Sequence, residues 1–161
     1  PHFNSPSQRT ETMMTDQDFA STNIPTGVLR RAGTIMIVDD EPAIRTVGRA
    51  ILSTLNLTVM AAGSGEDAIT ALDNAFAEGR SPGLILLDLT MPGGMSGLDT
   101  FDRIRERFPQ IPVVACSGFF GDGAEEVCQR LGFADVLPKP YTPDALMTTV
   151  RRVLMRISGE A

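Results

Sequence analysis

The chain has 161 residues, 42% of them hydrophobic and 21% charged, which is enough for one globular domain with a core of its own. Its net charge is -6 and no basic block is present, so nonspecific nucleic-acid binding is not expected. No apolar run reaches the roughly 18 to 20 residues of a membrane helix, and no signal peptide precedes the domain. These absences predict a cytoplasmic protein without a membrane partner.

The domain boundaries follow from a change in composition. Residues 1–33 are rich in Ser, Thr, Asn, Gln and Pro and have no sustained apolar period, which is typical of a tail or linker. We expect one domain over residues 34–158 and a short C-terminal end, 159–161. Neither cysteine, Cys116 or Cys128, has a pairing or metal-type spacing, so both are expected to be small buried apolar residues.

From Thr34 onward, short apolar runs alternate with helical patterns. The expected strands are Thr34–Val38, Leu57–Ala61, the run from Leu84 that ends in Asp88, Ile111–Cys116 and Ala134–Leu137. Pro42 suits the first turn of the helix that follows the first strand. The second helix opens at Ser64 in a pattern resembling a capping box, and its apolar side is expected to be buried through Ile69, Leu72, Ala75 and Phe76. Five strands alternating with five helices predict an α/β fold with a doubly wound parallel sheet.

Polar side chains follow the strands of this expected sheet. In doubly wound sheets ligands bind outside the carboxyl ends of the strands. That edge receives Asp39 and Asp40 after the first strand, Asp88 after the third, Ser117 after the fourth and Lys139 after the fifth. Converging carboxylates repel one another, so the cluster calls for a hard cation, Mg²⁺ or Mn²⁺. A nearby lysine and hydroxyl suit phosphoryl oxygens, which suggests attack by Asp88 on a phosphoryl group to give an acyl phosphate.

Four motifs in this order resemble those of bacterial response-regulator receiver domains of the CheY-like type. The motifs are Asp39-Asp40-Glu41-Pro42, Asp88-Leu89-Thr90-Met91-Pro92, Cys116-Ser117-Gly118 and Lys139-Pro140. The match covers roughly residues 34 to 157. It implies a flavodoxin-like strand order, 2-1-3-4-5, with helices on both faces of the sheet.

The resemblance also implies a role for each site residue. Asp88 is the expected phosphoacceptor, and Ser117 and Lys139 are expected to hold the phosphoryl oxygens. The implied Mg²⁺ ligands are Asp40 and Asp88, Asp39 directly or through water, and the main-chain carbonyl of Thr90. The Lys139-Pro140 bond is expected to be cis, as is usual in the family.

The implied function is that of a two-component signalling switch, which is regulatory and catalyses only its own phosphorylation and dephosphorylation. Its expected partner is a sensor histidine kinase or a histidine phosphotransfer protein. Phosphorylation would remodel the face made by the fourth helix, fifth strand and fifth helix of the domain, through which a homodimer could also form. No direct contact with nucleic acid is expected.

Two departures from the family pattern qualify this interpretation. The family commonly has Tyr or Phe three residues before the lysine, where this chain has Val136. The loop Met91-Pro92-Gly93-Gly94-Met95-Ser96-Gly97 is one residue longer than the commoner form. Together with Ser117-Gly118-Phe119 and Lys139-Pro140-Tyr141, this longer loop resembles the receivers of hybrid histidine kinases or single-domain regulators more than it resembles transcription-factor receivers.

Two other functions remain open. Val136 favours a binding module that keeps the fold but acts independently of phosphorylation. An aspartyl phosphatase or phosphotransferase of the haloacid-dehalogenase type usually carries a second Asp two residues after the nucleophile, where this chain has Thr90. The aromatic residues Phe119, Phe120 and Tyr141 are expected to pack around a loop, with an output surface as the alternative.

Overall fold

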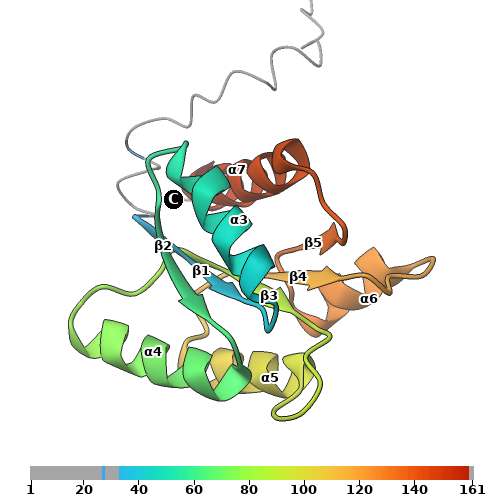
Figure 1. Cartoon of the computed structure of the whole chain (residues 1–161), viewed down its shortest axis with the longest axis horizontal. Helices are drawn as coiled ribbons and strands as arrows, with labels where there is room; N and C mark the ends of the chain where they lie inside the picture. The colour runs from blue at the N-terminus through green and yellow to red at the C-terminus, as the bar shows by residue number, and fades with distance from the viewer. Residues whose placement is uncertain (1–26, 28–32, 160–161) are drawn as a thin grey trace, which may run out of the picture.

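The computed structural model describes residues 27 and 33–159 (Figure 1). The expected tail, residues 1–33, therefore lies outside the described residues except for Gly27 and Gly33. Five strands form one parallel sheet in the order β2-β1-β3-β4-β5. This is the predicted doubly wound order, with strands and helices alternating along the chain.

The strands and helices have the following bounds. The strands are β1 Thr34–Val38, β2 Thr58–Ala62, β3 Leu84–Asp88, β4 Val113–Ser117 and β5 Asp135–Pro138. The helices are α3 Pro42–Ser53, α4 Gly65–Ala77, α5 Gly97–Arg107, α6 Ala124–Leu131 and α7 Pro143–Gly159. The expected bounds of β1 and β3 match these, while those of β2, β4 and β5 differ by one or two residues at their ends, where backbone pairing and not side-chain hydropathy decides the boundary.

The central strands are buried on both faces, as their continuous apolar runs predict. In β1, Ile35 and Ile37 point to one core cluster, while Met36 and Val38 point to the other. The first cluster contains apolar residues of α3 and α7, and the second contains those of α4, α5 and α6. The helices therefore form one layer on each side of the sheet, as Figure 1 shows for α3 and α7 against α4 and α5.

The starts of α4, α5 and α7 are fixed locally by polar caps. The hydroxyl of Ser64 accepts a hydrogen bond from the Asp67 N–H at 3.1 Å, as the capping pattern predicts. Ser96 and Thr142 cap α5 and α7 in the same way. Since parallel strands feed these helices from one edge of the sheet, the caps lie near the same edge as the predicted site residues.

Gly97 allows α5 to begin close to the end of β3. A Cβ atom at this position would lie 2.5 Å from the Leu89 Cα atom and 2.6 Å from the Asp88 carbonyl oxygen. These are backbone atoms that cannot rotate away, so a larger residue would push α5 and the end of β3 apart. The glycine thus helps to fix the chain directly after Asp88.

The expectation that Phe76 is buried was wrong, because 56% of this residue is exposed. Its helical spacing places it at the edge of the apolar stripe, near the end of α4, where its ring contacts that of Phe108 with centroids 5.8 Å apart. Cys116 and Cys128 are buried and free, as expected. Within the described residues, none of the helices combines the span and hydropathy of a transmembrane segment.

Candidate functional site

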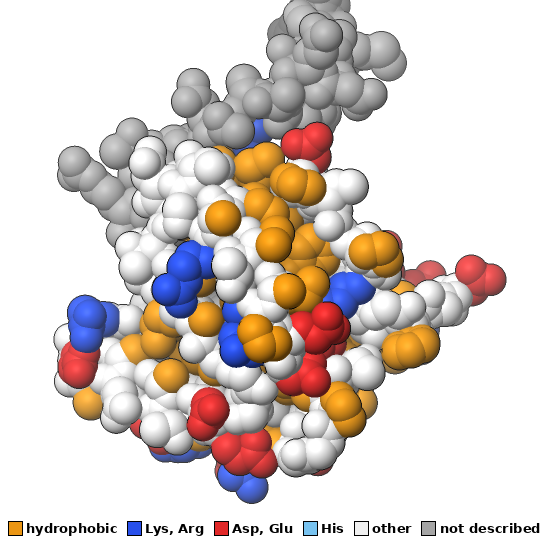
Figure 2. All heavy atoms as spheres, viewed as in Figure 1, with side chains coloured by type: hydrophobic (Ala, Val, Ile, Leu, Met, Phe, Trp, Pro, Cys, Tyr) orange, Lys and Arg blue, Asp and Glu red, His pale blue; other side chains and the backbone are white. Residues whose placement is uncertain are grey.

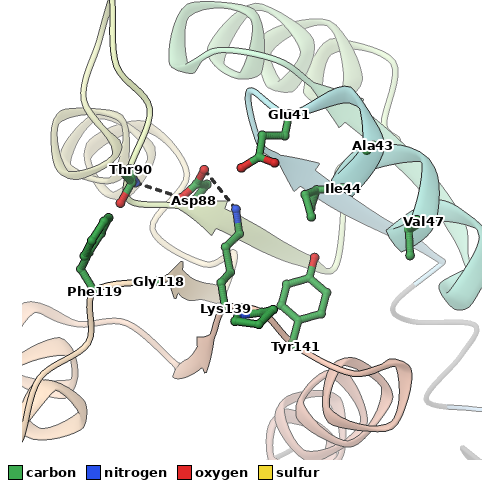
Figure 3. A pocket seen from close by; sticks show the side chains of 11 residues that line it. Glu41, Ala43, Ile44, Val47, Asp88, Thr90, Gly118, Phe119, Lys139 and Tyr141 are labelled. Carbon is green, nitrogen blue, oxygen red and sulfur yellow. Dashed lines mark hydrogen bonds and ion pairs between the residues drawn. The ribbon is translucent and has the colours of Figure 1, made fainter.

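The carboxyl edge of the sheet brings together side chains from four strand ends. Asp39 directly follows β1, Asp88 ends β3, Ser117 ends β4 and Lys139 directly follows β5. Figure 3 shows Lys139 extending toward Asp88 between the rings of Phe119 and Tyr141. The predicted residues are therefore neighbours in space, although Asp39 and Lys139 are 100 positions apart in the sequence.

The ammonium group of Lys139 joins two buried carboxylates. Its Nζ atom lies 2.5 Å from Asp39 Oδ2 and 3.2 Å from Asp88 Oδ2. The side chains of both acids are 3% exposed, and that of Lys139 is 14% exposed. Because a buried charge is costly without a partner, this shared cation offsets the cost of burying the two carboxylates.

The second oxygen of each carboxylate is held by the main chain. Asp39 Oδ1 accepts a hydrogen bond from the Glu41 N–H at 2.9 Å, and Asp88 Oδ1 accepts one from the Thr90 N–H at 2.9 Å. Each acid is thus fixed between Lys139 and the loop that follows its own strand. The two loops and Lys139 form one connected polar network.

Burial raises the pKa of the Asp88 carboxyl group above its ordinary value. The hydrogen bond from Thr90 lowers this pKa, the charge of Asp39 raises it, and Lys139 lowers it, with burial prevailing. For Lys139, burial alone lowers the pKa, but the hydrogen bond and charge of Asp39 and the charge of Asp88 raise it overall. Lys139 is therefore a permanent cation at neutral pH, while Asp88 is the less favourably ionised partner.

Ser117 lies beside Asp88 because β3 and β4 are neighbours, with Asp88 paired to Cys116. Its hydroxyl oxygen accepts a hydrogen bond from the Phe119 N–H at 3.1 Å, and its carbonyl accepts one from the Lys139 N–H at 2.8 Å. The hydroxyl keeps its own proton for donation to a ligand. The Lys139-Pro140 bond that follows is cis, as the resemblance implied.

A second acidic group lies at the end of β1. Carboxylate oxygens of Asp39, Asp40 and Glu41 lie within 4.8 Å of one another. Oxygen donors of this kind suit a hard divalent cation such as Mg²⁺. Of the predicted metal ligands, Asp39 and Asp40 belong to this group, whereas Asp88 does not and meets Asp39 at Lys139.

An open pocket of about 540 Å³ leads to Asp88 and Lys139 (Figure 3). Its other lining residues are Glu41, Ala43, Ile44, Val47, Thr90, Gly118, Phe119, Pro140 and Tyr141. Phe119 is 83% exposed, so the expectation that it packs around a loop was wrong. Phe120 and Tyr141 do pack against core clusters, and burial raises the pKa of Tyr141 to about 12.

Comparison with protein families identifies the domain. The model of the response regulator receiver domain matches residues 35–151. The chain belongs to the response-regulator receiver family. The receiver domain is a regulatory module of two-component systems, and receivers generally bind Mg²⁺ through acidic residues at this edge of the sheet.

Regulatory proteins and solved receiver domains are similar to this chain, and three of them serve as examples. The transcriptional activator protein ExaE of Pseudomonas putida is 36% identical over 122 residues, which are 74% of this chain and 54% of ExaE. The transcriptional regulator NtrC of Salmonella typhimurium is 30% identical over 76% of this chain and 25% of its own length. The receiver domain of NtrX from Brucella abortus is 31% identical with a TM-score of 0.67, covering 75% of this chain and 98% of that domain.

The chain spans between about a quarter and about half of the length of these curated relatives. Their names identify regulators of transcription. The expected closeness to receivers of hybrid histidine kinases therefore stays a prediction. The family membership itself rests on the receiver domain alone.

Sequence reasoning missed two side chains of this region. Glu41 was part of a recognised motif but not of the predicted metal ligands, although its carboxylate joins the acidic group. Arg45 donates a hydrogen bond to the Asp39 carbonyl oxygen at 2.7 Å. No hydropathy or spacing pattern in the sequence marks this bond. Val136, by contrast, lies half-buried against a core cluster, and no aromatic ring occupies its place.

The raised pKa of Asp88 predicts how stability depends on pH in metal-free buffer. A carboxyl group whose pKa is raised on folding favours the folded state while protonated and loses that contribution as pH rises through its folded-state pKa. Asp88→Asn removes the ionisable group. We expect this variant to melt a few degrees above the wild type at pH 7, with the difference shrinking toward pH 4.

Thermal unfolding monitored by circular dichroism, with a chelator present, measures this difference. Asp122→Asn, which changes an exposed acid in the loop before α6, controls for general effects of the substitution. A variant Asp88→Asn that is less stable than the wild type at pH 7 would contradict the inferred cost of the buried charge.

Proposed function

We propose that this receiver accepts a phosphoryl group on Asp88 from a phosphohistidine donor and that Mg²⁺ is required. The observation that carries the proposal is the position of the Asp88 carboxylate, beside Lys139 at the base of an open pocket. A nucleophile needs access, and a transferred phosphoryl group needs cations and hydrogen-bond donors near its oxygens. The pocket, Lys139 and Ser117 supply these conditions.

In the proposed reaction one carboxylate oxygen of Asp88 forms a bond to phosphorus. The bond between phosphorus and the imidazole nitrogen of the donor breaks, and its electron pair stays on that nitrogen. Lys139 is then a partner for one phosphoryl oxygen, and the Ser117 hydroxyl can donate to another. Both side chains act without changing their own covalent state.

The proposed Mg²⁺ ligands are Asp39, Asp40, Asp88 and the main-chain carbonyl of Thr90. Glu41 is a further acid of this group because its carboxylate lies near those of Asp39 and Asp40. A bound divalent cation neutralises phosphoryl charge and would also lower the pKa of Asp88. Mn²⁺ satisfies the same oxygen donors.

The receiver is a regulatory domain, and we propose that its only catalysis is its own phosphorylation and dephosphorylation. An enzyme of the haloacid-dehalogenase type is not favoured, since Thr90 stands where such enzymes carry their second acid. A phosphorylation-independent binding module is the second candidate. Val136 favours it because the aromatic ring that commonly reports phosphorylation in this family is replaced by a small side chain.

The proposed boundaries are residues 1–33 for a tail or linker, 34–158 for the receiver and 159–161 for the C-terminal end. The face formed by α6, β5 and α7 is the proposed site of switching and of a possible homodimer. Exposed apolar residues on α6, Val127 and Leu131, support its use as a contact surface. The cytoplasmic location and the lack of direct nucleic-acid contact remain part of the same proposal.

Phosphorylation is tested by incubating the chain with acetyl phosphate and Mg²⁺ and measuring its intact mass. We expect the wild type to gain one phosphoryl group. Asp88→Asn should gain none, because it removes the nucleophile, whereas the control Asp122→Asn should react like the wild type. Equal modification of the Asp88→Asn variant would show that another residue is the acceptor, and absence of modification and of Mg²⁺ binding in the wild type would reject the proposal.

The donor is proposed to dock on α3 beside the pocket. Figure 2 shows hydrophobic side chains gathered over this part of the surface, next to acidic side chains. Ala43 and Val47 of α3 are exposed and line the pocket together with Ile44. A donor histidine must come within bonding distance of Asp88, so the protein that carries it has to cover this apolar rim.

A matched pair of valines tests this docking face. Val47 on α3 and Val127 on α6 are 53% and 54% exposed. The donor for this test is a histidine kinase that phosphorylates the wild type. We expect Val47→Asp to slow phosphoryl transfer from this kinase by about tenfold, the usual cost of a charge in an apolar contact. Val127→Asp should have little effect on this transfer.

Reaction with acetyl phosphate separates docking from chemistry, because this small donor needs no protein surface. Both valine variants should react with it at the wild-type rate. A Val47→Asp variant that accepts phosphate from the kinase as fast as the Val127→Asp variant would place the donor elsewhere.

A further inference from the structure

We propose that Arg45 is a positioning residue that holds the two acids at the end of β1 in place for a divalent cation. This inference rests on the proposed function of the site. Arg45 lies in the first turns of α3, is half-buried, and its Nη1 atom donates a hydrogen bond to the Asp39 carbonyl oxygen at 2.7 Å. A guanidinium group stays charged at all physiological pH values, so this is a charge-assisted hydrogen bond.

The carbonyl that Arg45 holds belongs to the peptide group between Asp39 and Asp40. A peptide group is planar, so fixing its oxygen also fixes the N–H of Asp40 and restricts the direction in which both side chains leave the chain. The preceding N–H of Asp39 is fixed as well, since it donates to the Ala62 carbonyl oxygen at 3.1 Å. Arg45 therefore completes the main-chain restraint at the point where the predicted metal ligands begin.

Gly63 provides the space that this arrangement needs. A Cβ atom at position 63 would lie 3.2 Å from Nη1, 3.5 Å from Cζ and 3.7 Å from Nη2 of Arg45. Gly63 is not among the glycines with positive φ, so space, and not an unusual backbone, is the reason for a glycine here. The guanidinium group thus lies against the bare backbone after β2 and connects α3, β1 and the β2–α4 loop.

Two opposing effects decide whether Arg45 helps or hinders a cation. Its positive charge repels a divalent cation, but this long-range effect is weakened by solvent and salt around a half-exposed site. Its hydrogen bond reduces the conformational freedom that Asp39 and Asp40 would lose when they bind the ion. We infer that the second effect prevails, so that removing Arg45 weakens cation binding.

The test compares the Mg²⁺ affinity of five variants with that of the wild type by isothermal titration calorimetry. Arg45→Met keeps much of the side-chain volume but removes every donor, and we expect about fivefold weaker binding, the size of one lost hydrogen bond. Arg45→Lys should recover part of the loss because it restores a charged donor. Arg49→Met, one turn further along α3 and exposed, should bind like the wild type.

Gly63→Ala distinguishes positioning from the loss of the arginine itself, because it keeps every existing side chain and its added Cβ atom lies nearest to the guanidinium group of Arg45. As a single substitution, Gly63→Ala should weaken Mg²⁺ binding. Added to Arg45→Met, it should cause little further loss of Mg²⁺ affinity. Unchanged or tighter binding by the Arg45→Met variant would overturn the inference. Independent, additive losses from Arg45→Met and Gly63→Ala would also overturn it.

A metal-free measurement keeps this test separate from the proposed function. If Arg45 holds the Asp39-Asp40 peptide, amide hydrogen exchange at Asp40 and Glu41 should be faster in the Arg45→Met variant than in wild type and Arg49→Met. Unchanged exchange would reject the positioning role. Failure of the wild type to bind Mg²⁺ would instead count against the proposed function.

Discussion

The site depends on one cation shared by two buried acids. Asp39 and Asp88 come from neighbouring parallel strands, and their carboxylates would repel each other if Lys139 did not lie between them. The same lysine is fixed by its main-chain N–H to the Ser117 carbonyl oxygen. A change of charge at Asp88 therefore alters the electrostatic interaction with Lys139. The main-chain hydrogen bond of Lys139 connects this change to the end of β4. This connection would give the proposed phosphorylation a physical route to the rest of the domain.

The packing of the fold keeps these charges at a fixed separation. β3 is buried on both faces, and the packing of its apolar residues holds Asp88 at the strand end. Gly97 lets α5 approach the backbone directly after Asp88, and Gly63 leaves room for Arg45 against the acidic loop. Small residues matter at the rim of the site because they let secondary structures approach closely. Lys139 matters because its ammonium group is the shared partner of both buried carboxylates.

The sheet and the meeting of its strand-end residues could be predicted from sequence, because strand alternation and the parallel topology leave only one edge for Asp88, Ser117 and Lys139. Contacts made by long side chains could not be predicted from the sequence. Arg45 reaches the Asp39 carbonyl across a helix turn, and no hydropathy pattern reports that bond. Helical spacing also failed for Phe76, since a residue at the margin of an apolar stripe can face either the core or solvent. Exposure of Phe119 likewise depends on the loop path after Ser117.

Beryllofluoride, which mimics an acyl phosphate on a carboxylate, gives the most direct test that Asp88 controls this network. In an NMR spectrum recorded with Mg²⁺, the account predicts that it shifts the amide signals of Ser117, Phe119 and Lys139 in the wild type and leaves them unchanged in the Asp88→Asn variant. The exposed loop at Gly79, between α4 and β3, lies at the other edge of the sheet, and its amide signals should not shift in either protein. A wild-type spectrum without shifts between Ser117 and Lys139 would contradict the account and favour a binding module that works independently of phosphorylation.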